Sequence, residues 1–212
     1  MSDTRTADGA VTSRRREATR QKLLDAAAEV FAEVGLDAAS VEAICERAGF
    51  TRGAFYSNFE TKDELMLALT ERVAGEKIDE VAERVAVLQA RGEDLEPDAL
   101  VRQLLDVAFE KKLGIMLTSE IRTRAMRDPR LAQTYIAWQS ALVERVGSFI
   151  EDLARTYRFR LRIPASEFAG VIMQTWEDTS AYAVMSGLGA EQTLRLVNER
   201  TARLATALVD PA

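Results

Sequence analysis

The segment that most constrains this chain spans residues 40–65 and reads SVEAICERAGFTRGAFYSNFETKDEL. Ser40 is a typical helix N-cap, and Gly49 is a typical residue at which a helix ends. Thr51 begins a second, very short helix, and the capping box TKDE begins a third. Two short helices joined at a glycine predict a helix-turn-helix, in which the second helix is built to enter a DNA major groove.

Apolar residues at helical spacing surround this motif and predict a small core. Before the motif they are Leu23, Leu24, Ala27, Phe31 and Val34, with Gly35 ending that helix, and after Ser40 they are Val41, Ile44, Cys45 and Ala48. On a helix from Arg52 onward, Phe55 and Phe59 share one face. We expect this face to pack on Leu23, Phe31 and Ile44.

The opposite face of the second helix is small at its centre, where it carries Gly53 and Ser57 with Ala54 beside them. Small side chains allow a helix backbone to sit deep in a groove about 12 Å wide. At the edge of this face the Tyr56 hydroxyl can reach a phosphate, and Arg52 can make a bidentate contact to guanine. A half-buried surface aromatic is the alternative interpretation of Tyr56.

Two helix N-termini add to the phosphate-binding capacity of the motif. Free backbone N–H groups at Ser40 and at Thr61 suit phosphate oxygens, and Lys62 adds a full positive charge at the second place. The alternative is that Ser40 and Thr61 are ordinary helix caps. The joint spacing of these groups is more informative than any one of them.

The composition is that of an ordinary globular protein and argues against most enzyme classes. The 212 residues are 47% hydrophobic and 29% charged. No apolar run approaches the ~20 residues of a membrane span, and the N-terminus lacks the apolar region of a signal peptide. Histidine is absent, which removes Ser-His catalysis and His-ligated metal sites. We therefore expect a cytoplasmic protein that is not an enzyme and has no catalytic residue, metal or cofactor.

The single cysteine, Cys45, allows no internal disulfide. It follows Ile44 on the apolar side of the first short helix, so it is interpreted as a small buried filler. A redox-sensing thiol is the alternative.

The net charge of −6 is unusual for a protein that binds DNA, so the placement of charge matters more than its sum. Residues 1–64 carry 9 Lys/Arg and 12 Asp/Glu, a balance of −3. Basic residues nevertheless cluster before and at the start of the first helix, at Arg14, Arg15, Arg16, Arg20 and Lys22. The RRR run is either an arm that contacts phosphates or the minor groove, or a solvated tail.

The rest of the chain predicts helices and no credible strand. Helical spacing, caps and breakers place these helices at about 62–90, 97–112, 115–127, 129–157, 165–186 and 190–208, for about nine helices in all. Residues 158–164 alternate like a strand but lack a partner, so they are interpreted as an extended loop. The predicted fold is all-α, with a disordered basic arm over 1–15, a three-helix helix-turn-helix domain over 16–62, and a helical effector-binding and dimerisation domain over 63–212.

Residues 19–69 resemble the N-terminal DNA-binding domain of the TetR family of transcriptional regulators. The resemblance rests on LLDAAAEVFAEVGLDAAS, VEAICERAG, FTRGAFYSNF and TKDEL. It implies that Tyr56 and Lys62 contact phosphates, and that Arg52, Gly53 and Ser57 lie in the groove. The full expected DNA-binding set is Ser40, Thr51, Arg52, Gly53, Ala54, Tyr56, Ser57, Asn58 and Lys62. Ser57-Asn58 departs from the aromatic-histidine pair that is frequent in the family, so base preference cannot be copied.

The resemblance also implies a homodimer, in which the last two helices of each subunit form an intersubunit four-helix bundle. Two stripes fit this role, namely Phe168, Ile172, Thr175, Trp176 and Thr179, and Leu194, Val197, Thr201, Leu204 and Leu208. A two-fold dimer places two recognition helices about 35 Å apart and predicts a pseudo-palindromic DNA operator.

The middle helices are expected to enclose a pocket for a small lipophilic effector. The candidate ligand-binding residues are Phe109, Met116, Tyr135, Trp138, Met173 and Trp176, for which ordinary core packing is the alternative. Four charged residues, Glu110, Glu120, Arg122 and Glu177, either orient a polar group of the ligand or are surface charges.

Three functions follow from these observations. The leading hypothesis is a ligand-responsive repressor that binds its operator as a homodimer and is released by the effector. The second is a DNA-binding regulator without a small-molecule effector, constitutive or controlled by another protein. The third, a helical-bundle enzyme, requires a nucleophile–base pair or a metal cluster that the sequence does not offer.

Overall fold

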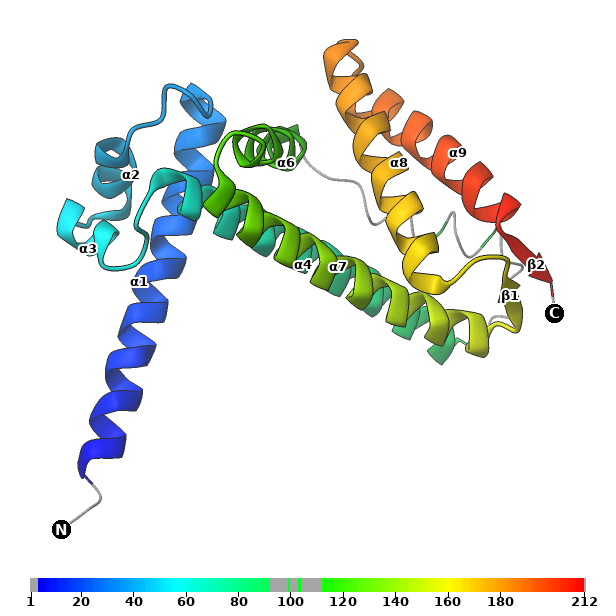
Figure 1. Ribbon diagram of the computed structural model, residues 1–212, viewed down its shortest axis with the longest axis horizontal. Helices are drawn as coiled ribbons and strands as arrows, with labels where there is room; N and C mark the ends of the chain where they lie inside the picture. The colour runs from blue at the N-terminus through cyan, green and yellow to red at the C-terminus, as the bar shows by residue number, and fades with distance from the viewer. Residues whose placement is uncertain (1–3, 92–98, 100–102, 104–111, 212) are drawn as a thin grey trace. The chain divides into compact units, whose positions relative to one another are not determined.

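The computed structural model describes residues 4–91, 99, 103 and 112–211, and these are predominantly helical (Figure 1). The chain forms two compact units, Met1–Glu71 and Arg72–Ala212. The division falls within one helix, α4 (Lys62–Ala90). The boundary between functional domains at residues 62 and 63 remains a prediction. In the described part of the chain, no helix is long and apolar enough to cross a membrane.

The first unit contains the predicted helix-turn-helix. Its helices are α1 (Thr4–Val34), α2 (Val41–Ala48), α3 (Arg52–Tyr56) and the beginning of α4. Helix α1 packs on α2, and α2 packs on α3. The aromatic pair Phe55 and Phe59 is buried, as are Leu23, Phe31 and Ile44, which the sequence predicts as its packing partners. The predicted core position Val34 is instead 53% exposed, because it lies in the last turn of α1.

The N-terminal segment differs from its prediction. In place of a disordered arm over residues 1–15, the structure has helix from Thr4 onward. Once a helix is nucleated, each further residue adds a backbone hydrogen bond at little cost, so the packed part of α1 can extend outward without a core of its own. The side chains of Arg14, Arg15 and Arg16 are exposed on this extension.

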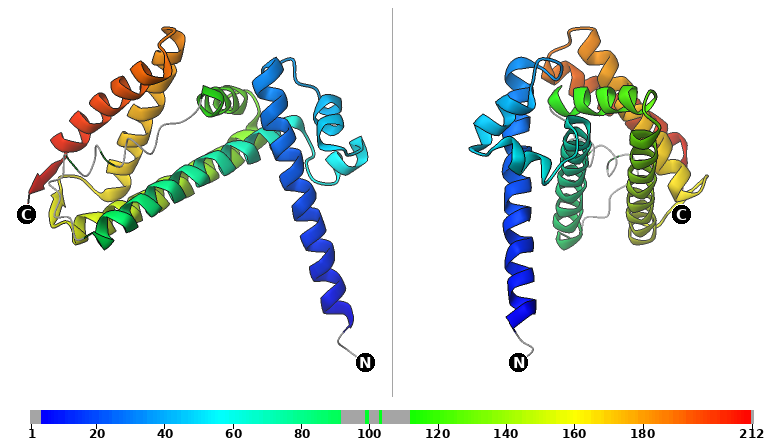
Figure 2. Two further views of the ribbon diagram at one scale, coloured as in Figure 1. Left: turned by 180° about the vertical axis from the view of Figure 1, so that it is seen from behind. Right: turned by 60° about the vertical axis from the view of Figure 1, so that its left-hand side comes forward.

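The second unit contains the later part of α4 and four more described helices. These are α6 (Lys112–Ala125), α7 (Pro129–Thr156), α8 (Ala165–Met185) and α9 (Ala190–Ala207). The helix predicted over 97–112 lies almost entirely outside the described residues. Helix α7 packs on α6 and α8, and α8 packs on α9 (Figure 2). The contact of α7 with α8 is close at Gly147, where a Cβ atom would lie 3.1 Å from the Ser166 Cα atom.

The prediction that residues 158–164 lack a partner strand is wrong. Phe159–Leu161 forms β1, which pairs antiparallel with β2 (Val209–Pro211) at the far end of the chain. The partner was missed because three residues after a helix carry too little periodicity to predict a strand. The Arg162 guanidinium reinforces the ribbon by donating to the Asp210 carboxylate. Beneath it, Val209 is buried with Phe168 and Ala205.

Replacing Val209 by alanine tests whether this ribbon contributes to the core. We expect Val209→Ala to lower the free energy of unfolding by about 1–2 kcal/mol, because two buried methyl groups are lost. The matched control is Val87→Ala on α4, whose side chain is 42% exposed and which is expected to change stability by less than about 0.5 kcal/mol. Urea unfolding followed by circular dichroism measures both. Equal unfolding midpoints would contradict a structural role for β2.

Candidate functional site

The turn between α2 and α3 is fixed by local caps that the sequence predicts. The Ser40 hydroxyl accepts from the Ala43 N–H at 3.1 Å, and the Thr51 hydroxyl accepts from the Ala54 N–H at 3.3 Å. Gly49 ends α2 with φ of 71°, in the left-handed region that favours glycine. The two helices are therefore set at a defined angle, with both N-caps exposed.

Arg52 lies at the first position of α3 and is 61% exposed. Its guanidinium forms an ion pair with Glu42 of α2 at 2.8 Å and lies 5.8 Å from the centre of the Tyr56 ring. Hydrogen bonding to Tyr56 and the negative charge of Glu42 raise the pKa of Arg52 above its ordinary value. Tyr56 itself is 48% exposed and lies edge-on to Phe55. One cation and one phenol are therefore presented together at the surface of α3.

Between these groups α3 exposes only small side chains. Gly53 is exposed, and a Cβ atom added to it would meet only the Thr51 hydroxyl, at an ordinary 3.7 Å. The packing of the protein therefore does not require glycine at this position. Ser57 is also exposed, and its hydroxyl donates to the Ala54 carbonyl at 2.9 Å. An external surface can approach the backbone of α3 closely here.

Asn58, which the sequence predicts to contact DNA, lies mostly below this surface. Its side chain is only 8% exposed, and its Nδ2 atom donates to the Ala54 carbonyl at 2.8 Å. Asn58 thus closes the C-terminal end of α3 from the inside. The sequence favoured an external role because the residue is polar and follows the short helix.

Lys62 has structural partners that the sequence did not reveal. Its ammonium donates to the backbone carbonyls of Leu36 and Ala39, at 3.0 and 2.9 Å. These carbonyls belong to the loop that leads into the α2 N-cap, Ser40. Lys62 therefore ties the beginning of α4 to the beginning of α2, and its charge lies beside that loop.

Two further arginines hold the helices of the first unit together. The Arg47 guanidinium on α2 bridges Glu29 and Glu33 on α1, at 2.9 and 2.6 Å, and its hydrogen bond lowers the pKa of Glu33. The Arg20 guanidinium lies 4.3 Å from the centre of the Phe59 ring. Arg20 therefore packs against the motif, although the sequence grouped it with the basic cluster. The buried thiol of Cys45 confirms its interpretation as a core residue, and burial raises its pKa.

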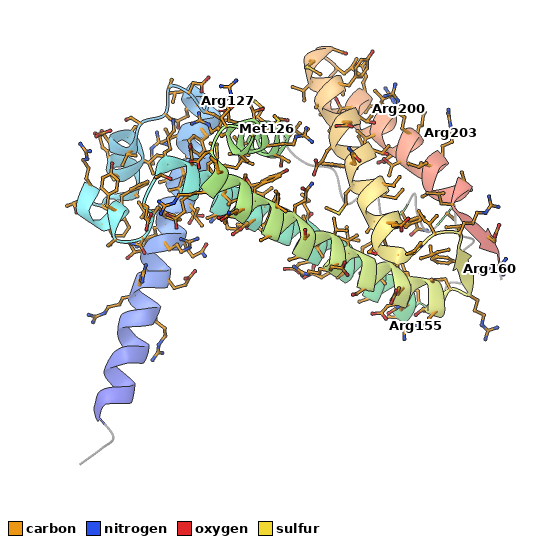
Figure 3. All side chains as sticks on the ribbon, in the orientation of Figure 1. Met126, Arg127, Arg155, Arg160, Arg200 and Arg203 are labelled. Carbon is orange, nitrogen blue, oxygen red and sulfur yellow. The ribbon has the colours of Figure 1, made fainter. Side chains whose placement is uncertain are left out.

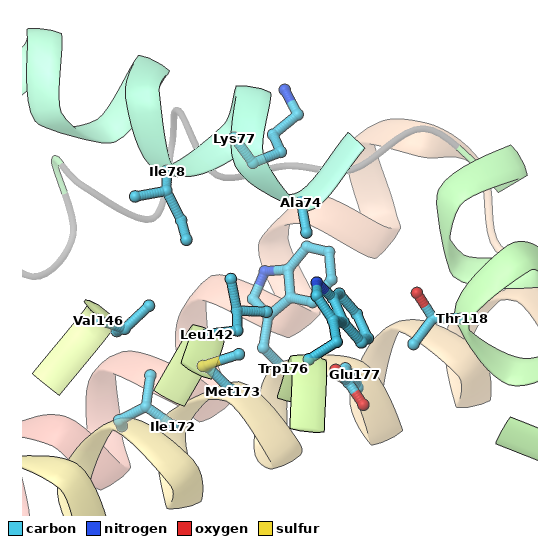
Figure 4. A pocket seen from close by; sticks show the side chains of 11 residues that line it. Ala74, Lys77, Ile78, Thr118, Leu142, Val146, Ile172, Met173, Trp176 and Glu177 are labelled. Atoms are coloured by element: carbon cyan, nitrogen blue, oxygen red, sulfur yellow. The ribbon is translucent and has the colours of Figure 1, made fainter. Parts of the chain in front are cut away.

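The second unit contains a cavity of about 190 Å³ between helices (Figure 4). Its walls come from one face of each of four helices, and they consist of Ala74, Lys77 and Ile78 on α4, Thr118 on α6, Trp138, Leu142 and Val146 on α7, and Ile172, Met173, Trp176 and Glu177 on α8. The amine of Lys77 points away from Trp176 in Figure 4 and pairs with Glu80 at 2.6 Å. Lys77 thus contributes its hydrocarbon stem to the wall, while its ammonium forms an ion pair with Glu80.

Polar groups in and next to the cavity are incompletely paired. The Glu177 carboxylate lies 3.5 Å from the Arg122 guanidinium, longer than a strong charge-assisted hydrogen bond. Burial raises the pKa of Glu177, and Arg122 only partly offsets this. The Tyr135 hydroxyl and the Trp176 indole nitrogen are buried without a hydrogen-bond partner among the described residues. Burial and the charge of Glu177 also raise the pKa of Tyr135.

The structure brings together part of the predicted ligand-binding set. Trp138, Met173 and Trp176 line the cavity. Tyr135 is buried beside Trp138, with ring centres 5.5 Å apart, and does not line it. Met116 does not line it either and is 38% exposed, whereas Phe109 lies outside the described residues. Trp138, Leu142 and Val146 are spaced four residues apart and so share one face of α7. This spacing is the sequence signal from which Leu142 and Val146 could have been predicted as lining residues.

The stripe predicted on α8 for subunit contact is divided between two roles. Ile172 and Trp176 line the cavity, while Phe168 and Thr179 are buried within the unit. Among the described residues, no cluster of three or more Cys, Asp or Glu side chains is arranged to hold a metal ion.

Comparison with known proteins agrees with this architecture. The sequence model of the bacterial regulatory proteins of the tetR family matches residues 23–69. The HTH-type transcriptional repressor AcnR of Corynebacterium efficiens is 28% identical over 82% of this chain and 85% of its own length. The regulator UidR of Escherichia coli strain K12 is 27% identical over 63% of this chain and 65% of its own length.

Solved structures share the fold over almost the whole chain. A TetR-family regulator from Mesorhizobium loti superimposes with a TM-score of 0.67, at 16% identity, over 91% of this chain and 98% of its own. A TetR regulator from Haloarcula marismortui gives a TM-score of 0.67, at 16% identity, over 92% of this chain and 100% of its own.

An exposed helix-turn-helix followed by a helical unit with a cavity is the architecture of a DNA-binding transcriptional regulator. The match over residues 23–69 and the relatives that align along most of the chain indicate which family of regulators this chain is similar to. The chain therefore carries a DNA-binding segment over residues 23–69 that matches the TetR family, and it is similar along most of its length to regulators of that family.

Replacing Lys62 by methionine tests its structural role. We expect Lys62→Met to lower the free energy of unfolding of the first unit by about 1–3 kcal/mol, because two hydrogen bonds from a charged donor are lost. Lys22→Met, at an exposed position of α1, is the matched control and should change stability by less than about 0.5 kcal/mol. Urea unfolding measures both variants. Similar stability of the two variants would show that the Lys62 bonds contribute nothing.

Neutralising Glu177 should stabilise the second unit at neutral pH. A carboxyl whose pKa is raised by burial destabilises the folded state wherever the unfolded chain is ionised, and the cost disappears as pH falls below its ordinary value. We therefore expect Glu177→Gln to have a higher melting temperature than the wild type at pH 7 and no advantage at pH 4. The exposed Glu151→Gln on α7 is the control. A lower melting temperature at pH 7 would mean that the Arg122 pair outweighs burial.

Proposed function

We propose that this protein is a repressor that binds a pseudo-palindromic operator as a homodimer and is released by a small effector bound in the cavity of the second unit. The DNA-binding part of the proposal rests on the exposed face of α3, where small side chains lie between Arg52 and Tyr56. An N-terminal cap and buried neighbouring residues hold this helix in place. The named repressor AcnR, which aligns along most of the chain, supports repression over activation.

The proposed DNA contacts fall into two kinds. Arg52, Gly53 and Ser57, with Ala54 beside them, read the groove by direct approach of α3 to the bases. Tyr56 and the exposed N-caps Ser40 and Thr51 contact phosphates. Lys62 supports the second kind of contact through the loop before Ser40, and its charge adds to the field at that N-terminus.

The proposed dimer uses α8 and α9, which pack together as a hairpin. Exposed apolar side chains on α8 are available for subunit contact, since Val171, Tyr182 and Met185 are 39%, 51% and 80% exposed. The buried Val197 and Thr201 of α9 are used within the subunit. Arg200 and Arg203 project from α9 (Figure 3), and Arg200 lies 5.5 Å from the centre of the Tyr182 ring.

The proposed link between ligand and DNA is α4. This helix supplies Lys62 to the first unit and Ala74, Lys77 and Ile78 to the cavity wall. A ligand that favours one position of α4 changes the spacing of the two recognition helices in the dimer. It lowers operator affinity by as much as it prefers the state that cannot bind DNA. A regulator without an effector would give no stabilising compound in a thermal-shift screen.

Gly53→Ala separates groove approach from stability. Once the operator has been identified by sequencing DNA fragments bound to the protein, we expect this variant to bind it at least about tenfold more weakly, because a methyl group intrudes where the backbone meets the bases. The folded protein accommodates the methyl group, so stability should stay the same or rise by up to about 1 kcal/mol. Gly170→Ala on α8, where a Cβ atom meets nothing within 4 Å, is the matched control. Unchanged operator affinity in Gly53→Ala would place α3 outside the groove.

Arg52→Ala and Tyr56→Phe should affect operator binding in different ways. Arg52→Ala should remove discrimination of about 1–3 kcal/mol at one base pair of each half-site. Tyr56→Phe should weaken binding to all operator variants alike, because a phosphate contact carries no sequence information. Fluorescence anisotropy with a panel of single-base operator variants measures both. A uniform loss in Arg52→Ala would assign this residue to a phosphate.

A further inference from the structure

The cavity of the second unit combines aromatic faces with one carboxylate. The chain has two tryptophans, and both Trp138 and Trp176 line the cavity. Most of the remaining wall is aliphatic or thioether, from residues such as Leu142, Ile172 and Met173. Indole faces attract cations more strongly than other aromatic side chains do, and the attraction increases when the site excludes water.

The charge on the cavity wall is negative and only loosely balanced. Of the charged side chains that line this cavity, Lys77 has its amine paired with Glu80 outside the wall. Glu177 remains, and the Arg122 guanidinium stands 3.5 Å away and is 37% exposed. The Arg122 side chain reaches solvent, whereas the Glu177 side chain is only 22% exposed, and a buried carboxylate needs a partner inside the protein.

We propose that the cavity binds a small lipophilic organic cation, with its ammonium beside Glu177 and the indole faces and its apolar body along Leu142, Ile172 and Met173. The inference deepens the proposed function, on which its regulatory meaning rests, by naming the class of the effector.

The other ligand classes fit this wall less well. An anionic head group would lie against Glu177 without a free cation on the wall to pair with it. A neutral ligand would gain apolar contact with the indole rings but no cation–π attraction, and it would leave the carboxylate as poorly solvated as before. The volume of about 190 Å³ is below the range of about 300–1,000 Å³ that is usual for drug-sized ligands, so the ligand is small.

Three compounds with one phenylalkyl body test the head group: 4-phenylbutylammonium, 4-phenylbutan-1-ol and 4-phenylbutanoate. We expect the wild-type protein at pH 7.5 to bind the ammonium at least about tenfold more tightly than the alcohol, and the carboxylate most weakly. Isothermal titration calorimetry gives the affinities. Tryptophan fluorescence reports occupancy of this cavity directly, because both tryptophans line it. Equal or tighter binding of the alcohol or the carboxylate, or no binding of any of the three, would overturn the proposal.

Glu177→Gln should reduce the preference for the ammonium over the alcohol to within about threefold, while the control Glu151→Gln on the exposed face of α7 should keep it. The preference should also fall as pH is lowered through the raised pKa of Glu177. The titratable and charged groups around this carboxyl are Arg122, Asp178, Tyr135 and Lys77. A preference that persists in Glu177→Gln contradicts the assigned role of the carboxylate. If that variant does not fold, the comparison of the three compounds on the wild type still decides.

Operator binding separates this inference from the proposed function. If the ammonium binds with the expected preference and leaves operator affinity unchanged, the cation site stands and the effector role fails. Conversely, release of the operator by the alcohol alone would uphold a ligand-responsive regulator and overturn the cation site. Anisotropy of labelled operator, recorded at saturating concentration of each compound, distinguishes the two results.

Discussion

The DNA-binding unit of this protein depends on neighbouring residues that stabilise a helix too short to be stable alone. Helix α3 has five residues, far fewer than the ~12–15 that an isolated helix needs to be even marginally stable in water. Its position therefore comes from its surroundings. Thr51 caps its beginning, Asn58 closes its end, and the buried rings of Phe55 and Phe59 fix its inner face. The exposed side is then free to be small, because none of its residues is needed for stability.

The same arrangement explains how an acidic chain can present a surface for DNA. Much of the positive charge in the first unit is engaged internally, with Arg47 between two glutamates, Arg20 over Phe59 and Lys62 on two carbonyls. These cations set the geometry of the motif. In the proposed DNA complex, the phosphate contacts then come from helix N-termini and Tyr56, and Arg14, Arg15 and Arg16 along α1 would add to them if the arginine run acts as an arm; this fits a protein whose net charge is −6.

The features that could be predicted from the sequence are those with local causes. Both ends of α2 follow from Ser40 and Gly49, and the beginning of α7 at residue 129 follows from Asp128, its N-cap, and Pro129, its first residue; these effects act within one helical turn. Features with distant partners could not be predicted. Lys62 bonds to carbonyls more than 20 residues earlier, and β1 finds its partner near residue 210. The cavity illustrates both cases, since its tryptophans were evident, whereas the placement of Glu177 beside them depends on how the helices pack.

The ion pair between Arg52 and Glu42 has a consequence for fidelity. An exposed pair of this kind is worth at most about 1 kcal/mol, so a guanine that offers Arg52 two acceptors can displace the carboxylate. In the proposed complex, an Arg52 side chain that turns to a base leaves Glu42 as an unpaired anion next to the DNA. At a correct base the new contact offsets that repulsion, whereas at an incorrect base nothing does. In the proposed complex Glu42 would therefore weaken binding to incorrect sequences, and the acidity of the first unit would contribute to discrimination.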